Sequence, residues 1–331
     1  MKRSRRIGPT RLTDRPDPST RLDPVVEVAH SLKADRTTCE ILEVFGSAGI
    51  RSILLKGASI ARWIYDNEGE RPYRDSDLLV QTRQVDVAEN LLSEIGFEHA
   101  PLDDLPHDRP WHAHAWVRSS DNTGVDLHRS LIGIAVSPDE AWSVLSEETE
   151  KMDLLGSDVE VLSPAARTFH VAIHAAQDGR RLGKPIEDLR RALSRVDFPT
   201  WERAALLAAR LEALSAFVAG LRLEPEGQRL LERLDVHARV SMEDALRAEG
   251  APQLALSLEW LTHAPGVKEK LLFLARRVVP PPTFMRAWSS TARRGRLGLV
   301  LAYLWRPVWS LLQIGPALRS WRRARKQVKT P

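Results

Sequence analysis

Two aspartates at spacing two are the residues whose types and positions most directly suggest chemistry in this chain. Asp75 and Asp77 stand just ahead of an apolar run, in the segment RPYRDSDLLV at 71–80. On a β-strand, side chains two residues apart point to the same face. Neighbouring carboxylates repel each other unless a cation lies between them, and Mg²⁺ prefers carboxylate oxygens while keeping positions for phosphate. The pair predicts a metal site for phosphate chemistry; two solvated acids at a strand edge are the alternative.

A third carboxylate, Asp126, lies in the segment GVDLHRSL at 124–131, which has the alternation of a second strand. Because Val125 and Leu127 are apolar, Asp126 is expected to point away from the core, toward the same kind of face. Three carboxylates from neighbouring strands could hold two Mg²⁺ or Mn²⁺ ions that assist an in-line displacement at phosphorus. We therefore predict all three aspartates as metal ligands and catalytic residues.

A candidate phosphate-binding turn precedes these acids. Lys56, Gly57, Ala58 and Ser59 follow the apolar run RSILL and precede a helical pattern. A glycine turn that opens a helix presents backbone N–H groups to an anion, and Lys56 would add a positive charge. The turn does not match G-x-x-x-x-G-K-[ST], which excludes a P-loop. We predict that these four residues bind the nucleotide phosphates. His128, on the face of Asp126, is a further candidate, with a partly exposed surface histidine as the alternative.

The elements that must position these residues alternate in the first half of the chain. The pattern predicts helices over 25–49, 58–65, 85–95 and 138–148, and strands over 51–55, 75–81, 97–100, 111–119, 124–131 and around 151–162. Beyond Ser163, a predicted N-cap with Pro164 at the first helical position, helices are expected over 164–178, 186–196, 200–221, 225–236, 240–249 and 252–263. This order indicates an α+β fold: a mixed sheet with flanking helices, then an α-helical domain.

The predicted domain boundaries follow from composition. Residues 1–24 form a basic segment of low hydrophobicity that we expect to be disordered, and the run VPPP at 279–282 marks a break before a basic tail. We assign 25–162 to the α/β domain, 163–279 to the helical domain and 280–331 to a basic, tryptophan-rich amphipathic tail.

Three segments together resemble the uncharacterised nucleotidyltransferase family, family 5 of the DNA polymerase β-like nucleotidyltransferase superfamily. They are LLKGASIARWIYDNEGERPYRDSDLLV, GVDLHRSL and SPAARTFHVAIHAAQDG…LGKPIEDLRRAL, and the resemblance covers roughly 25–200. It implies that Gly57 is the turn glycine, that Asp75 and Asp77 are the metal-binding pair, and that Asp126 is the third carboxylate. Lys56 and Arg71 match a lysine and an arginine that recur in the family, and we expect both to bind the nucleotide.

The resemblance implies an enzyme that transfers NMP from an NTP, with ATP expected, to an acceptor hydroxyl and releases pyrophosphate. Mg²⁺ or Mn²⁺ would be its cofactor. The acceptor could be a small molecule, a natural-product peptide, a protein or a tRNA. Two other classes stay open: a non-catalytic nucleotide-binding protein, and an adaptor that acts at a membrane surface or on nucleic acid.

The other histidines point less clearly to a site. His112 and His114 are expected to share a strand face, but no third ligand stands at a useful spacing, which disfavours zinc. His170 and His174 lack the glutamate of H-E-x-x-H, which disfavours a metalloprotease. His174 and Asp188 match residues that recur in the family's helical half. We expect them to pack or to hydrogen-bond between helices.

The C-terminal tail carries a charge opposite to that of the body. From Leu271 onward there are 13 Lys and Arg and no Asp or Glu, so the remaining 35 basic and 44 acidic residues give the body a net charge of −9. Because Arg306-Pro307 interrupts an apolar run, we expect two short amphipathic segments rather than a membrane span. They could pack on the helical domain, lie on an anionic membrane surface or bind RNA. A single cysteine, Cys39, suits the cytoplasm, with the inner membrane face as a peripheral location.

Overall fold

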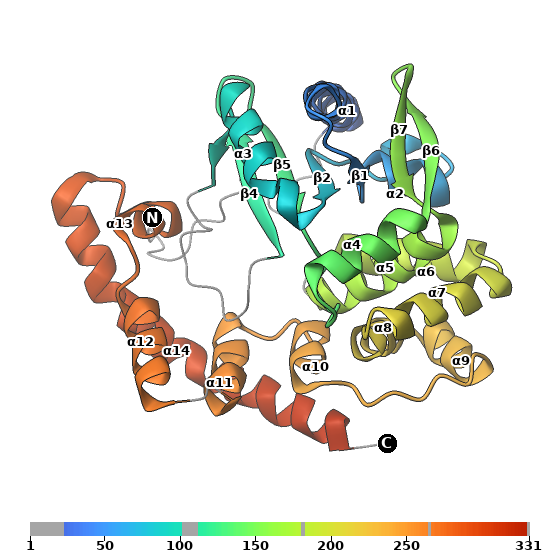
Figure 1. The fold of residues 1–331 in the computed structure, drawn as a ribbon. Helices are drawn as coiled ribbons and strands as arrows, with labels where there is room; N and C mark the ends of the chain where they lie inside the picture. Colours follow the sequence, from blue (N-terminus) through green and yellow to red (C-terminus); the bar gives the residue numbers. More distant parts are fainter. Residues whose placement is uncertain (1–22, 101–111, 180–182, 264–265, 330–331) are drawn as a thin grey trace. The chain divides into compact units, whose positions relative to one another are not determined.

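The computed structural model describes residues 23–100, 112–179, 183–263 and 266–329, so the predicted disordered arm lies almost wholly outside the described residues. The chain forms two compact units (Figure 1). Asp23–His99 and His112–Gly250 make the body of the larger unit, and Ala251–Arg323 makes the body of the smaller one. The larger unit joins the sheet to the helices that directly follow it. The domain boundaries drawn from composition stay a prediction, since compactness alone does not define a folding domain.

Within the described residues, one mixed sheet of seven strands runs in the order β3-β4-β5-β2-β1-β7-β6. Its middle combines parallel pairs, β2 with β5 and β1 with β7, with antiparallel neighbours. The strands are β1 (Ser52–Leu54), β2 (Asp75–Val80), β3 (Glu98–His99), β4 (Ala113–Arg118), β5 (Thr123–His128), β6 (Thr149–Leu154) and β7 (Ser157–Leu162).

Helices flank the sheet and then continue without further strands among the described residues. The first group is interleaved with the strands: α1 (Pro24–Ser47), α2 (Ala58–Ile64), α3 (Val85–Glu94) and α4 (Pro138–Glu147), with short 3₁₀ turns η1 (Glu68–Glu70) and η2 (Thr82–Gln84). The second group follows β7: α5 (Pro164–Asp178), α6 (Gly183–Arg195), α7 (Phe198–Arg210), α8 (Leu214–Leu221), α9 (Pro225–Arg233), α10 (Met242–Ala248), α11 (Gln253–His263), α12 (Val267–Val278), α13 (Pro282–Trp288) and α14 (Gly295–Lys329). The α+β class predicted from the sequence is confirmed.

Capping explains where the helical half begins. The Ser163 side chain accepts a hydrogen bond from the Ala166 backbone N–H, and Pro164 occupies the first turn, where its missing N–H costs nothing. From there α5 packs against α6, α7, α8 and α10. The single helix predicted over 200–221 is wrong, because α7 ends and Glu212 takes a left-handed φ of 50° before α8 starts. That conformation cannot continue a right-handed helix.

The two faces of the central strands have different surroundings. Strand pairing aligns Ser76 with Val125 and Leu78 with Leu127, so these four side chains share one face. That face is covered by α1, where Thr38 Oγ1 lies 2.5 Å from Ser76 Oγ. The intervening residues of β2 and β5 therefore point to the opposite face, which carries the predicted carboxylates.

The basic tail differs from the expectation of two short amphipathic segments. It contains one continuous helix, α14, with Pro307 and Pro316 inside it. A proline inside a helix costs about 3 kcal/mol because it removes one hydrogen bond and crowds the preceding turn. Local packing offsets part of this cost: Arg306 is buried, with its guanidinium 5.0 Å from the Phe284 ring and 5.1 Å from the Trp288 ring of α13.

Among the described helices, the Gly295–Arg325 part of α14 is long and apolar enough to span a membrane by length and composition. In its most apolar window of 18 residues, 17% of the residues are buried. One side of α14 is packed against α13, and the other side is exposed. Leu299, Ala302, Tyr303 and Trp309 pack with α13 in a small core. On the other side, large apolar side chains are exposed at Leu297, Val300, Leu301, Leu304, Val308, Leu311, Leu312, Ile314 and Leu318.

Candidate active site

The strand register brings the predicted carboxylates together. Asp77 of β2 is the direct partner of Asp126 of the parallel strand β5, and Asp75 lies two residues earlier on the same face. Ligand atoms of Asp77, Asp126 and His128 lie within 4.8 Å of one another. Asp75 is exposed, Asp126 is half-buried and Asp77 is buried, so the cluster reaches from the sheet interior to solvent.

Lys56 and His128 both contact the buried carboxylate. Lys56 Nζ lies 2.5 Å from Asp77 Oδ1, and His128 Nε2 lies 3.0 Å from the same oxygen. Burial alone would raise the pKa of Asp77, but the charges and hydrogen bonds of Lys56 and His128 hold it far below the ordinary value. Burial alone would lower the pKa of Lys56, but Asp77, Asp126 and Asp75 raise it. The lysine therefore lies in the field of all three carboxylates.

The glycine turn fixes Lys56 at this position. Leu55, just before the turn, donates its backbone N–H to the Asp77 carbonyl at 2.9 Å, which ties the end of β1 to β2. Gly57 then takes φ +66°, and a Cβ there would lie 3.2 Å from the Tyr73 ring, so the conformation and the close approach both favour glycine. Ala58 and Ser59 begin α2 with buried side chains.

Arg71 makes a buried ion pair with Asp188, and Asp77 of the carboxylate cluster lies near enough to raise the pKa of the Arg71 guanidinium. Its Nε and Nη2 each lie 2.7 Å from a carboxylate oxygen of Asp188 on α6, and its Nη1 donates to the Gly57 carbonyl at 3.4 Å. Tyr65 adds a third hydrogen bond of 2.7 Å to Asp188. Nucleotide binding by Arg71 stays a prediction, but this geometry gives the side chain a structural role, because it connects α6 to the glycine turn.

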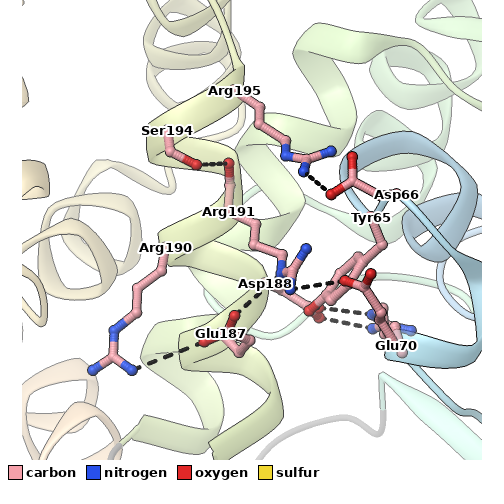
Figure 2. Close-up of polar contacts among 10 residues, drawn as sticks. Tyr65, Asp66, Glu70, Glu187, Asp188, Arg190, Arg191, Ser194 and Arg195 are labelled. Carbon is pink, nitrogen blue, oxygen red and sulfur yellow. Dashed lines mark hydrogen bonds and ion pairs between the residues drawn. The ribbon is translucent and has the colours of Figure 1, made fainter.

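Further ion pairs hold the same helix against the segment after α2, as Figure 2 shows. Arg191 Nη2 lies 2.9 Å from Glu70 Oε2, and Arg195 Nη2 lies 2.6 Å from Asp66 Oδ2. Arg191 and Arg195 project from α6 and, together with Asp188, reach the segment around Tyr65. This helix therefore braces the turn that carries Lys56. The expectation that Asp188 bonds between helices agrees with its contacts to Tyr65, at the end of α2, and to Arg71.

The sequence reasoning missed His170 as a neighbour of the cluster. Burial is the main cause that holds the pKa of the His170 imidazole well below its ordinary value, and the charges of His174 and Lys56 lower it further. Asp77 and His128 also lie near enough to act on it. The only signal in the sequence was its place one turn before His174, which pairs with Asp178 of the same helix at 3.2 Å.

Two buried imidazole nitrogens at the cluster, and one buried hydroxyl just after the glycine turn, have no hydrogen-bond partner among the described residues. They are Ser59 Oγ, His128 Nδ1 and His170 Nδ1. Leaving such an atom unpaired costs about 1–3 kcal/mol, so sites of this kind commonly mark a place for a polar ligand or ion. Two carboxylates with an imidazole form an oxygen-rich donor set that fits a divalent cation such as Mg²⁺ or Mn²⁺.

Carboxylates on neighbouring strands, facing a lysine held by a glycine turn, fit metal-assisted chemistry on phosphate groups. A sequence model of uncharacterised nucleotidyltransferases matches residues 25–226, and the chain belongs to this family. The match includes the 25–200 region that was expected from the sequence motifs. It covers both the sheet and the helices up to the start of α9, and it identifies the protein as an enzyme that transfers nucleotidyl groups.

Two solved structures match part of this chain. One is the antibiotic-resistance factor ANT(2'')-Ia, with 15% sequence identity and a TM-score of 0.39, covering 54% of this chain and 94% of that chain. The other is an antigenic nucleotidyltransferase-like protein from Paracoccidioides brasiliensis, with 16% identity and a TM-score of 0.31, covering 57% of this chain and 92% of that chain. No protein with a curated description matches the sequence.

Proposed function

We propose that the protein transfers NMP from an NTP, with ATP as the preferred nucleotide, to an acceptor hydroxyl in a reaction that depends on Mg²⁺ or Mn²⁺. The observation that carries the proposal is the register that sets Asp77 beside Asp126, with Lys56 bound to the first of them. A solvated strand-edge acid would not be buried as Asp77 is, with a lysine and a histidine on one carboxylate oxygen.

Each side chain has a role in the proposed reaction. The acceptor oxygen attacks the α-phosphorus, the bond to the bridging oxygen of pyrophosphate breaks, and the hydroxyl proton passes to Asp126, which is half-buried. Lys56 neutralises charge on the triphosphate, which lies near Lys56–Ser59. His128 orients Asp77 through its 3.0 Å contact. Asp75, Asp77 and Asp126 would hold the cations, whose charge, when they are bound, lowers the pKa of the acceptor hydroxyl and stabilises the leaving group.

The test is label transfer from α-labelled NTPs in the presence of Mg²⁺ or Mn²⁺. Acceptors of each class, small molecules, peptides, proteins and tRNA, are offered in parallel. We expect a labelled product and free pyrophosphate that both disappear with EDTA, and unlabelled ATP to compete best. Calorimetry that shows NTP binding with no transfer to any acceptor would favour a non-catalytic nucleotide-binding protein instead.

Replacing Lys56 should separate metal binding from nucleotide binding. Lys56→Met removes the ammonium that sits 2.5 Å from Asp77 and raises local negative charge. We expect Mn²⁺ to bind several-fold more tightly, because it no longer competes with the ammonium, and NTP to bind about tenfold more weakly, a change of about 1.4 kcal/mol. Calorimetric titration with Mn²⁺ and then with NTP measures both. Arg83→Met, on the 3₁₀ turn η2, is the control. If both affinities stay unchanged in Lys56→Met, the role of Lys56 is wrong.

We further propose that α14 places the enzyme at an anionic membrane surface on the cytoplasmic side. The exposed apolar residues of α14 recur at helical spacing, so they form one stripe opposite the side that packs on α13. Arginines flank the stripe at both ends, at Arg293, Arg294 and Arg296, and at Arg319, Arg322, Arg323 and Arg325. Apolar residues at the interface and basic residues on the headgroups are the arrangement of helices that lie on anionic bilayers.

Charging the apolar stripe should release the protein from vesicles. We expect the double variant Leu304→Asp and Leu311→Asp to lose flotation with phosphatidylserine-containing vesicles, while the wild type floats with these and not with purely zwitterionic vesicles. Leu206→Asp, at a residue of α7 that is 69% exposed, is the matched control and should float normally. Flotation that is insensitive to the double change, or salt-sensitive RNA binding without vesicle binding, would contradict the membrane proposal.

A further inference from the structure

A second cluster of metal-ligating side chains lies on the face of the central sheet that does not carry the carboxylates. Glu89 of α3, His99 of β3 and His114 of β4 each place one ligand atom so that all lie within 4.8 Å of one another. His114 is the partner of Leu127, whereas Ala115 is the partner of Asp126. Successive residues of a strand face opposite ways, so the sheet itself separates the two clusters.

The three side chains of this cluster already lie in contact. His114 Nδ1 lies 2.6 Å from Glu89 Oε1. The His99 and His114 rings meet edge to face, with centroids 4.7 Å apart. In a tetrahedral zinc site with bonds of about 2.1 Å, ligand atoms lie about 3.4 Å from one another. Small side-chain rotations would therefore bring all three ligand atoms to one ion without moving the backbone.

The donor chemistry selects a transition metal over Mg²⁺. Two imidazoles and one carboxylate are the ligands of three-residue zinc sites, in which water completes the coordination, whereas Mg²⁺ requires oxygen. The His99 ring also meets the buried Trp116 ring edge to face at 5.1 Å, which gives the cluster an apolar wall. The His114 and Glu89 side chains are 18% and 22% exposed, so an ion from solvent can reach them.

We propose that Glu89, His99 and His114 bind Zn²⁺ and that the ion fastens the edge of the sheet. The strand β3 has two residues and pairs with β4 at two positions only, which is a weak attachment. An ion held by α3, β3 and β4 joins three elements at that edge. His112 precedes β4, and its ring lies 6.0 Å from that of His128, on the carboxylate side.

Zinc titration of the EDTA-treated full chain tests the proposal. Calorimetry is run with Mg²⁺ in excess, so that the carboxylate cluster is occupied, and Co²⁺ absorption reports the coordination. We expect one zinc per chain at this site, and a rise in Tm of about 5 °C at zinc concentrations 100-fold above Kd. His99→Gln and His114→Gln should each weaken zinc binding at least about 100-fold. His237→Gln, at an exposed histidine paired with Asp235, should leave it unchanged.

Two further outcomes decide against the site. Zinc binding of wild-type affinity and stoichiometry in both His99→Gln and His114→Gln would overturn it. So would zinc binding that is lost in Asp77→Asn but kept in the histidine variants, because the ion would then belong to the carboxylate cluster. His99 is exposed on the two-residue edge strand β3, so His99→Gln is expected to keep the fold, which circular dichroism checks.

Discussion

Asp77→Asn should abolish nucleotidyl transfer while leaving a folded protein. The change keeps the shape of the side chain and removes the charge that Lys56 and His128 surround. Removing one donor from a preorganised electrostatic site costs about 100- to 1,000-fold in rate, and a shared metal ligand should cost at least the upper value. We therefore expect label transfer from an α-labelled NTP to fall by about 1,000-fold or more, with Mn²⁺ binding weakened in the same variant.

The fold should survive this change because other carboxylates compensate Lys56. Asp126 and Asp75 both lie close enough to raise the pKa of Lys56, so its charge is not left without a counter-charge. We expect a loss of about 1–3 kcal/mol in the free energy of unfolding from the weakened hydrogen bonds. Asp158→Asn, at an exposed residue of β7 that pairs with Lys151, is the matched control and should keep full activity. Undiminished label transfer by folded Asp77→Asn would refute the assignment of the site.

The carboxylate cluster could be predicted from the sequence because strand geometry is local. Alternation fixes which residues of a strand share a face, so Asp75 and Asp77 were placed together by spacing, and Asp126 by its apolar neighbours. The register of Asp77 with Asp126 could not be read in this way, because two parallel strands separated in sequence can slide by two residues without changing faces. The family resemblance indicated that the two acids meet, and the strand pairing shows how.

Contacts between distant elements were beyond the sequence. The proposed zinc ligands Glu89, His99 and His114 come from three different elements. His114 follows Glu89 by 25 positions and His99 by 15, which matches no metal-binding motif. The continuity of α14 through Pro307 also could not be predicted. Proline disfavours a helix by a cost that tertiary packing can offset, and the contacts of Arg306 with α13 are not visible in the local pattern. The ion pair of Arg71 could not be predicted either. Its position before the aspartates indicated phosphate binding, whereas its partner Asp188 lies on a helix more than 100 residues later.

Breaking the pair of Arg71 and Asp188 should destabilise the larger unit more than any exposed ion pair. The two side chains are 4% and 2% exposed and share two hydrogen bonds of 2.7 Å. Removing one partner of a buried pair leaves the other charge uncompensated, at a cost of about 3–5 kcal/mol. We expect Asp188→Ala to lower Tm by about 10 °C in a unit of this size. Arg229→Ala, which breaks an exposed pair with Glu226, should cost less than about 1 kcal/mol.

The destabilisation should depend on pH in a defined direction. Burial alone would raise the pKa of Asp188, but Arg71 and Tyr65 hold it below the ordinary value. A carboxyl with a lowered folded pKa stabilises the fold above its unfolded pKa, near 3.9, and this contribution is lost as the pH falls through the folded value. The difference in unfolding free energy between wild type and Asp188→Ala should therefore be full at neutral pH and shrink at strongly acidic pH. A difference that grows with acid would contradict the ionised pair.

The double variant Arg71→Met and Asp188→Leu separates a bracing role of Arg71 from phosphate binding. Replacing both charges by apolar side chains removes the uncompensated ion, so most of the lost stability should return. If Arg71 mainly braces the Gly57 turn, which it contacts at 3.4 Å, NTP affinity in the double variant should fall less than tenfold. If Arg71 binds phosphate, as the family resemblance implies, affinity should fall by 100-fold or more even though stability has recovered. We would measure unfolding curves and NTP titrations for the wild type, both single variants and the double variant. One double-mutant cycle then gives the coupling of the two residues in the free energy of unfolding and in that of NTP binding.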